Sequence, residues 1–183
     1  MVLHAKGGSF MKKNGMISQF YPDEWVDSTF EIDYEKLYKR GFRGILFDID
    51  NTLVQHDAPA DSRAGKLLKK LKNLGFKICL VSNNKEGRVK KFAKELGIDY
   101  VFSANKPSRK GFRRAMKRIG TTIKNTVSIG DQVFTDVFGS NRAGVYSILV
   151  KPIAKKEEIQ IVLKRFLEKI VLYFYLKDRK KKR

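Results

Sequence analysis

From Phe30 onward, short runs of β-branched and other apolar residues alternate along the chain with amphipathic stretches. This order is typical of a parallel sheet whose strands are joined by helices. The runs GILF and ICLV are almost continuously apolar, which suits strands that are covered on both faces. We therefore expect a Rossmann-like α/β fold, a three-layer α/β/α sandwich around a five-stranded, mainly parallel sheet. The five expected strands are residues 44–50, 77–83, 100–104, 126–131 and 145–150.

Four amphipathic stretches lie between these strands, and each is followed by a glycine. Glycine adopts the left-handed conformation that closes a helix at little cost, so the stretches are expected to be helices. A further helix is expected at residues 156–175, where apolar residues recur at helical spacing. The four helices between strands are expected at residues 61–74, 86–96, 108–119 and 135–143.

The length of 183 residues fits one domain with a core of its own. We expect a poorly ordered N-terminal arm at residues 1–20, a single domain at 21–176 and a basic tail at 177–183. The lone cysteine, Cys79, allows no internal disulfide and lies in an apolar run. This cysteine usage favours a reducing, cytoplasmic location.

Lys and Arg number 39 against 19 Asp and Glu, which gives a formal net charge of +20. Such a charge predicts attraction to polyanions, either nucleic acid or anionic lipid. The segment IVLYFYL at residues 170–176 is apolar on every side and directly precedes the basic KDRKKKR. It is shorter than the ~20 residues of a membrane-spanning helix. It either packs on the sheet or inserts into a lipid surface beside the basic tail, and both alternatives stay open.

Acidic side chains cluster where the expected strands end, which is where open α/β sheets bind ligands. Asp48 and Asp50 lie two residues apart at the end of the first strand. Carboxylates this close repel each other unless a cation lies between them. With Asp131 at the end of the fourth strand they offer only hard oxygen ligands, which favours Mg²⁺ over zinc. We expect a Mg²⁺ site with Asp48, Asp50 and Asp131 as ligands.

Four motifs follow one another at these strand ends: a DxDxT motif, a serine after an apolar strand, a lysine and a GDxxxxD motif. Each alone has a simpler explanation, such as a helix cap for the last aspartate. In this order they resemble the haloacid dehalogenase superfamily of phosphohydrolases, subclass IIIA, over residues 44–150. The matching residues are Asp48, Asp50, Thr52, Ser82, Lys106, Gly130, Asp131 and Asp136.

The resemblance implies a catalytic cycle that runs through two aspartates. Asp48 would attack phosphorus and form an aspartyl phosphate, which divides one difficult hydrolysis into two easier displacements. Asp50 would protonate the leaving alkoxide and then accept a proton from the attacking water.

The remaining motif residues are implied to bind the phosphate group or to support it. Ser82 and Lys106 would hold the transferring phosphoryl oxygens, and Thr52 belongs to the same phosphate-binding set. Asn83 lies outside the motifs, and we expect it to join this set by shaping the phosphate-binding loop. Asp136 would support Lys106 or a water on the metal.

The intervals after the first and second motifs are too short for a cap domain. An uncovered site cannot exclude water from a small metabolite with its own lid, so we expect a phosphate presented by something large. The segment at residues 20–53 resembles bacterial phosphatidylglycerophosphate phosphatases. This resemblance implies hydrolysis of an anionic phospholipid, phosphatidylglycerophosphate, to phosphatidylglycerol by a peripheral protein on the inner face of the cell membrane.

Two other functions remain as alternatives. The first is a phosphatase for nucleotides or nucleic-acid ends, since the charge would equally serve a phosphate backbone. The sequence contains no aromatic-rich RNA-binding signature and no recognition-helix motif to support it. The second is a non-catalytic scaffold that binds RNA or ribosomes, against which the intact nucleophile Asp48 argues.

Overall fold

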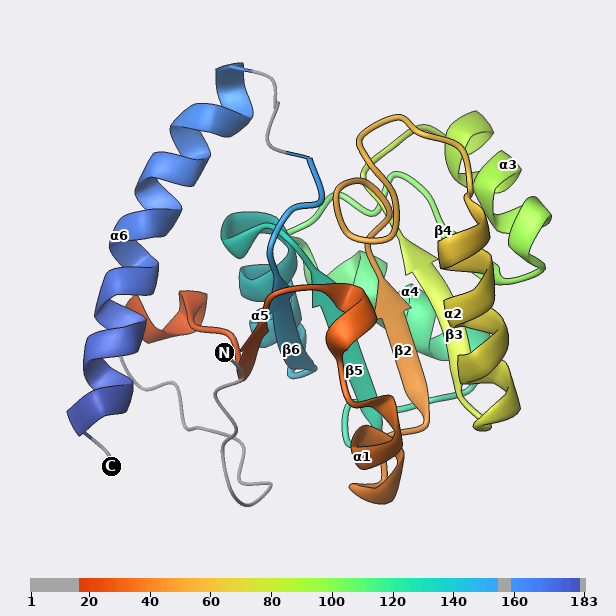
Figure 1. The fold of residues 1–183 in the computed structure, drawn as a ribbon, viewed down its shortest axis with the longest axis horizontal. Coiled ribbons are helices and arrows are strands. Elements are labelled where there is room, and N and C mark those ends of the chain that lie inside the picture. The colour runs from red at the N-terminus through yellow and green to blue at the C-terminus, as the bar shows by residue number, and fades with distance from the viewer. Residues whose placement is uncertain (1–16, 155–158, 182–183) are drawn as a thin grey trace.

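The computed structural model describes residues 17–154 and 159–181, which form a parallel sheet flanked by helices (Figure 1). The sheet has six strands in the order β1-β6-β5-β2-β3-β4, and every neighbouring pair is parallel. This arrangement confirms the expected Rossmann-like α/β class. The strands are β1 Glu24–Val26, β2 Gly44–Phe47, β3 Lys77–Val81, β4 Asp99–Val101, β5 Thr126–Gly130 and β6 Tyr146–Val150.

The expected number of five strands was wrong because the edge strand β1 was missed. β1 has only three residues and pairs in parallel with β6, with Trp25 opposite Leu149. Its sequence, EWV, is too short to show an alternating or continuous apolar pattern. The chain is extended here because it pairs with β6, and not because of a pattern in its own sequence.

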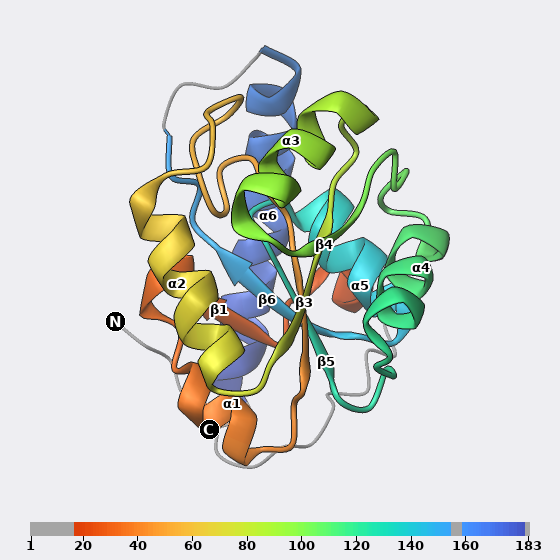
Figure 2. The same cartoon turned by 90° about the vertical axis from the view of Figure 1, so that its right-hand side faces the viewer.

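Side chains alternate between the two faces of the sheet and so separate two cores. In β2, Ile45 and Phe47 contribute to one core, whereas Leu46 contributes to the other. Figure 2 shows the sheet nearly edge-on between the two helical layers. The first layer contains α1 Tyr34–Lys39, α2 Ser62–Asn73 and α3 Glu86–Leu96, and the second contains α4 Arg109–Ile119 and α5 Phe138–Ala143.

Local sequence signals explain where these helices begin and end. The Asp61 side chain accepts a hydrogen bond from the Ala64 amide at the start of α2, and Ser108 caps α4 in the same way. α3, α4 and α5 end at the left-handed glycines Gly97, Gly120 and Gly144. The helix expected at 135–143 is divided into a π-helical turn, η3 Val133–Val137, and α5.

The C-terminal helix α6, Ile159–Lys181, lies along one edge of the molecule, at the left in Figure 1. It continues through most of the segment expected to be a basic tail, and residues 156–158 and 182–183 lie outside the described chain. Val171 and Leu172 of α6 pack on a cluster of Val133, Val137 and Leu149. Of the expected N-terminal arm, residues 1–16 lie outside the described chain, and Ile17–Phe20 form the 3-10 helix η1.

Two absences expected from the sequence hold within the described residues. The chain between β2 and β5 forms only α2, β3, α3, β4 and α4 with their connecting loops, so no cap domain is inserted there. In the same described ranges, no helix combines the length and the apolar character needed to cross a bilayer.

Candidate active site

The register of the sheet brings two of the predicted aspartates together. β2 and β5 are neighbours, with Phe47 opposite Ile129. Asp48 follows β2 directly, and its amide donates to the Ile129 carbonyl oxygen at 3.0 Å. Asp131 follows the last residue of β5. Both residues therefore lie at the carboxyl edge of adjacent central strands.

Asp48, Asp131 and Asp136 form a compact carboxylate cluster, in which one oxygen from each lies within 4.8 Å of the others. Lys106 follows β4, which lies in the sheet on the opposite side of β2 from β5, and its side chain reaches this cluster. Its Nζ atom lies 2.5 Å from Asp48 Oδ1 and 2.6 Å from Asp136 Oδ1. Asp48 and Asp136 thus share one ammonium group, and with Asp131 the cluster holds three carboxylates against one ammonium, which leaves negative charge in excess when all of them are ionised.

The pKa values of the cluster reflect this arrangement. Burial raises the pKa of Asp48 above its usual value; Lys106 opposes the shift, while Asp136 and Asp131 add to it. Burial alone would lower the pKa of Lys106, but the carboxylates of Asp136 and Asp48 raise it overall. A divalent cation would offset the excess negative charge, and the oxygen-only donor set fits a hard ion such as Mg²⁺.

Asn83 fixes the backbone that carries the lysine. Its side-chain oxygen accepts a hydrogen bond from the Lys106 amide at 2.6 Å, and its Nδ2 donates to the Lys106 carbonyl oxygen at 3.1 Å. Asn83 was expected in the phosphate-binding set. In the structure its amide is occupied with Lys106, which makes it a support for the lysine.

The two predicted hydroxyl residues are buried at neighbouring strand ends. Thr52 Oγ1 donates to Asp131 Oδ1 at 3.2 Å, so it contacts the carboxylate cluster directly. Ser82 follows β3, and its Oγ accepts a hydrogen bond from the Asn84 amide at 3.1 Å. Thr52 therefore orients a cluster carboxylate, and Ser82 orders the loop after β3.

Gly130 has a steric reason to be glycine. A Cβ atom at this position would lie 2.4 Å from Asp136 Cγ, far inside van der Waals contact. Asp136 in turn accepts a hydrogen bond from the Gln132 amide at 3.1 Å through Oδ2. The glycine of the GDxxxxD motif therefore provides the space in which Asp136 reaches Lys106.

The Asp50 carboxyl group lies outside the compact cluster, although the sequence analysis grouped it with the metal ligands. Asn84 Nδ2 donates to its Oδ2 atom at 2.6 Å, and Arg88 Nη2 donates to its Oδ1 atom at 2.5 Å. Neither partner was predicted as a site residue from the sequence. Asn84 had a weak signal, since it directly follows Ser82 and Asn83, whereas Arg88 is one of 39 basic residues and had none.

Comparison with protein-family models matches residues 55–144 to haloacid dehalogenase-like hydrolases. The matched range contains Ser82, Lys106, Asp131 and Asp136 and begins after Asp48. Over 159 residues the chain is 42% identical to Probable phosphatase YqeG of Bacillus subtilis (strain 168), which covers 86% of this chain and 92% of that protein.

A second relative is Phosphatidylglycerophosphate phosphatase 1, chloroplastic/mitochondrial, of Arabidopsis thaliana, at 30% identity over 164 residues. The alignment covers 75% of this chain but only 45% of the plant protein. Among solved structures, the cobalt-bound deoxy-D-mannose-octulosonate 8-phosphate phosphatase of Haemophilus influenzae matches with a TM-score of 0.50. At 19% identity, covering 63% of this chain and 70% of that one, this match shows a shared fold.

Proposed function

Because the chain belongs to the haloacid dehalogenase-like hydrolases and is a phosphatase of that family, we propose that Asp48 is its nucleophile. The observation that carries this proposal is the buried cluster in which Asp48 meets Lys106, Asp131 and Asp136. The ammonium group of Lys106 lies where it can hold both the Asp48 carboxylate and the oxygens of a phosphoryl group that approaches it.

The proposed reaction has two displacements. Asp48 attacks phosphorus, the bond from phosphorus to the ester oxygen breaks, and that oxygen takes a proton from the carboxyl group of Asp50. A water molecule then attacks phosphorus and gives a proton to Asp50, the bond from phosphorus to the Asp48 carboxylate oxygen breaks, and inorganic phosphate leaves while the Asp48 carboxylate is restored. Over the full cycle, the Asp48 carboxylate is regenerated, and the Asp50 carboxyl group donates one proton and then regains one.

Phosphatases of this family generally use a divalent metal ion, and we propose Mg²⁺ held by Asp48 and Asp131. When bound, Mg²⁺ would supply positive charge against the transferring phosphoryl oxygens. Asp136 and Thr52 would act indirectly, the first by holding Lys106 and the second by orienting Asp131.

The proposed substrate is the phosphomonoester of an anionic phospholipid, phosphatidylglycerophosphate. Two features support this substrate: the similarity to a plant phosphatase named for it, and a carboxyl edge of the sheet without an inserted cap. An edge of this kind admits a phosphate that remains attached to a large body.

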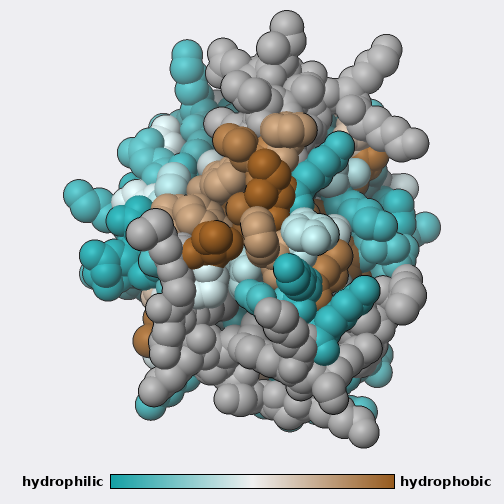
Figure 3. Space-filling view, turned by 90° about the vertical axis from the view of Figure 1, so that its left-hand side faces the viewer, coloured by the Kyte–Doolittle hydropathy of each residue, from teal (hydrophilic) through white to brown (hydrophobic). Residues whose placement is uncertain are grey.

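We place the contact with the membrane on the outward face of α6. Large apolar side chains recur there at helical spacing, and Figure 3 shows an apolar patch on this side of the molecule. The opposite face of α6 packs on the domain, since Glu168 and Tyr175 are buried. One side of the 170–176 segment therefore packs on the domain while the other stays exposed. The exposed apolar residues are Phe166, Leu167, Ile170, Tyr173 and Phe174, with exposed Lys169, Lys177 and Lys180 among them.

Such a face suits an anionic lipid surface, because apolar insertion and attraction of lysines to headgroups act together. We propose that the protein works as a peripheral membrane enzyme on the cytoplasmic side, docked by this face.

Phosphate release from four substrates tests the function. The substrates are phosphatidylglycerophosphate in phosphatidylcholine vesicles, glycerol 3-phosphate, a nucleoside monophosphate and a 5′-phosphorylated oligonucleotide, each with and without Mg²⁺. We expect Mg²⁺-dependent release that is fastest from the lipid and absent in Asp48→Asn. Turnover of the soluble esters with an inert lipid would contradict the lipid substrate while leaving the phosphatase intact. Preference for the oligonucleotide would favour a phosphatase of nucleic-acid ends.

A further inference from the structure

The Asp50 carboxyl group makes several polar contacts that together fix its position. Oδ2 accepts from Asn84 Nδ2, and Oδ1 accepts both from the Asp57 amide at 2.8 Å and from Arg88 Nη2 at 2.5 Å. The side chain of Asp50 is only 15% exposed. Both oxygens are therefore engaged, and the carboxyl group has one preferred orientation.

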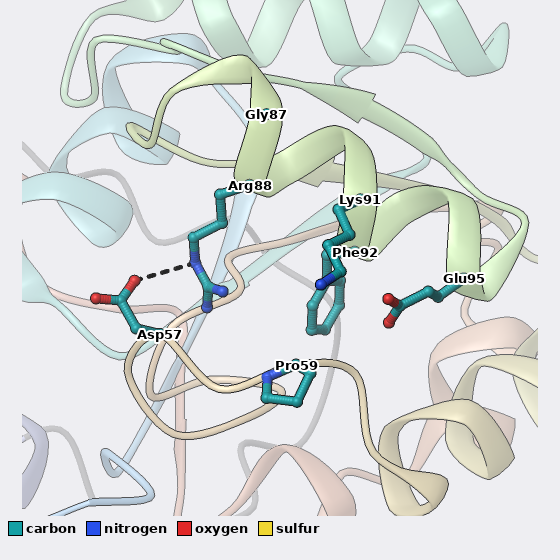
Figure 4. Close-up of a pocket in the computed structure, with 7 residues that line it drawn as sticks. All are labelled: Asp57, Pro59, Gly87, Arg88, Lys91, Phe92 and Glu95. Atoms are coloured by element: carbon teal, nitrogen blue, oxygen red, sulfur yellow. Dashed lines mark ion pairs between the residues drawn. The ribbon is translucent and has the colours of Figure 1, made fainter.

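Among these partners, Arg88 makes further contacts to the loop that follows Asp50. It belongs to the first turn of α3, after the loop that carries Ser82, and it reaches across to the loop that follows Asp50. There its Nη2 also donates to the Ala58 carbonyl oxygen at 3.2 Å, and its Nε lies 3.3 Å from Asp57 Oδ1. Figure 4 shows the Arg88 side chain extended from α3 toward Asp57.

Polar contacts to Asp50, Ala58 and Asp57 hold the guanidinium group of Arg88. Arg88 borders a cavity of about 490 Å³, so one side of it faces open space. A planar guanidinium can bind several acceptors at fixed angles, which a lysine ammonium cannot. The other residues that line the cavity are Asp57, Pro59, Gly87, Lys91, Phe92 and Glu95.

We infer that Arg88 is a positioning residue that aims the Asp50 carboxyl group at the leaving-group oxygen. The inference rests on the proposed role of Asp50 as proton donor and acceptor, and it adds the residue on which that role depends. Arg88 itself touches neither the reacting atoms nor the carboxylate cluster in the contacts it makes.

The chemistry of the leaving group separates this role from a merely structural one. A glycerol-type alkoxide is a poor leaving group and needs the proton that Asp50 delivers, whereas p-nitrophenolate leaves without one. If the Asp50 carboxyl group loses its orientation, hydrolysis of an alkyl phosphate must therefore slow much more than hydrolysis of p-nitrophenyl phosphate.

The test compares kcat and KM of Arg88→Met, Arg88→Lys and Asp50→Asn on glycerol 3-phosphate and p-nitrophenyl phosphate. We expect Arg88→Met to lower kcat on the alkyl ester by about 10²-fold, the scale of a small misplacement of a reacting group. The loss on p-nitrophenyl phosphate should be much smaller, KM should change little, and Arg88→Lys should restore part of the rate. Arg113→Met, which removes an exposed arginine from α4, is the matched control and should behave as wild type.

A double variant completes the experiment. Arg88→Met added to Asp50→Asn should cause little further loss, because the two residues act through one group. Equal losses on both esters, an effect on KM alone, or full additivity in the double variant would overturn the inference. If Asp50→Asn shows the leaving-group dependence and Arg88→Met does not, only the inference fails. If Asp50→Asn lacks it as well, the proposed role of Asp50 fails with it.

Discussion

At the scale of single residues, the site depends on side chains that support other side chains. Asp48 contacts Lys106, Lys106 contacts Asp136, and the Asn83 amide fixes the Lys106 backbone on both sides. The two ion pairs of Lys106 are 2.5 and 2.6 Å long between largely buried side chains, so a small displacement of one member moves the next. The strictest steric requirement in this chain of contacts is the missing side chain of Gly130.

Gly130→Ala tests that requirement. The added methyl group would overlap the Asp136 side chain, so Asp136 must move and Lys106 loses a partner. We expect kcat to fall by about 10-fold or more, while the protein still folds, given rate losses near 10² for small misplacements.

Gly65→Ala, within α2, is the control for this substitution, because the new Cβ would meet only Leu96 Cδ2 of α3 at 3.8 Å, an ordinary van der Waals contact. It should leave kcat unchanged and raise the melting temperature slightly, since alanine favours a helix interior by up to about 1 kcal/mol over glycine. Wild-type kcat in Gly130→Ala would show that the position of Asp136 does not matter.

The sequence predicted Asp48 and Asp131 as neighbours because both follow central strands directly, and parallel register alone brings such residues together. It could not assign Asn83 to Lys106, nor select Arg88, because those contacts depend on where side chains from separate loops meet. The spacing of residues along the chain does not predict such contacts between side chains.

At the scale of secondary structure, α6 is joined to the site by one buried acidic residue. Glu168 Oε1 accepts a hydrogen bond from the Val133 amide at 2.7 Å, at the start of the η3 turn that carries Asp136. At the far end of the helix, Asp178 accepts from the Tyr21 hydroxyl at 3.0 Å. Hydrogen bonds therefore hold α6 to the domain near both ends of the part of the helix whose side chains are described.

Glu168→Ala should destabilise this junction, because it leaves a buried amide without its acceptor, at a cost of about 1–3 kcal/mol. We expect a lower melting temperature and a lower kcat, since η3 loses an anchor next to Asp136. Glu168→Gln keeps an acceptor oxygen and should lose much less of both. Equal behaviour of the two variants would show that the hydrogen bond to Val133 is unimportant.

The exposed face of α6 gives a separate prediction about lipid. Phe166→Ser combined with Tyr173→Ser should weaken binding to anionic vesicles, because the two side chains are 63% and 62% exposed and contribute little packing to the fold. Hydrolysis of p-nitrophenyl phosphate should remain at the wild-type rate. Vesicle sedimentation and the soluble assay measure the two effects, and unchanged sedimentation would exclude this face as the membrane contact.

Helices were easier to predict from sequence than the short elements. α3 and α4 have clear apolar spacing and a terminal glycine, and their predicted bounds agree with the structure to within one residue. α1 and β1 have six and three residues, too few to show a period. The sequence also showed an apolar 170–176 segment without showing which of its sides would be buried, because that depends on the position of Trp25 and Phe20.

At the scale of the whole molecule, the formal charge of +20 accompanies a site that itself carries excess negative charge. The basic surface would draw an anionic membrane toward the protein, while the buried carboxylates accept phosphate only together with positive charge. Composition alone left nucleic acid and lipid as partners. We propose lipid because the exposed aromatic face of α6 lies beside surface lysines.

Membrane binding should therefore depend on salt. We expect affinity for vesicles rich in phosphatidylglycerol to fall steeply as NaCl rises, since the Debye length shortens from about 10 Å at 0.1 M to about 3 Å at 1 M. Neutral phosphatidylcholine vesicles should bind weakly at every salt concentration. Sedimentation across a salt series measures both, and salt-independent binding of equal strength to both lipids would remove the electrostatic part of the account.

Trapping the intermediate would show whether Asp48 becomes phosphorylated during turnover. Borohydride reduces an aspartyl phosphate to homoserine, which peptide mass spectrometry locates in the sequence. During turnover with Mg²⁺ and substrate, the account predicts homoserine in place of Asp48, and none without substrate. Homoserine in place of Asp50 or Asp131, or none at all while phosphate is being released, would contradict it.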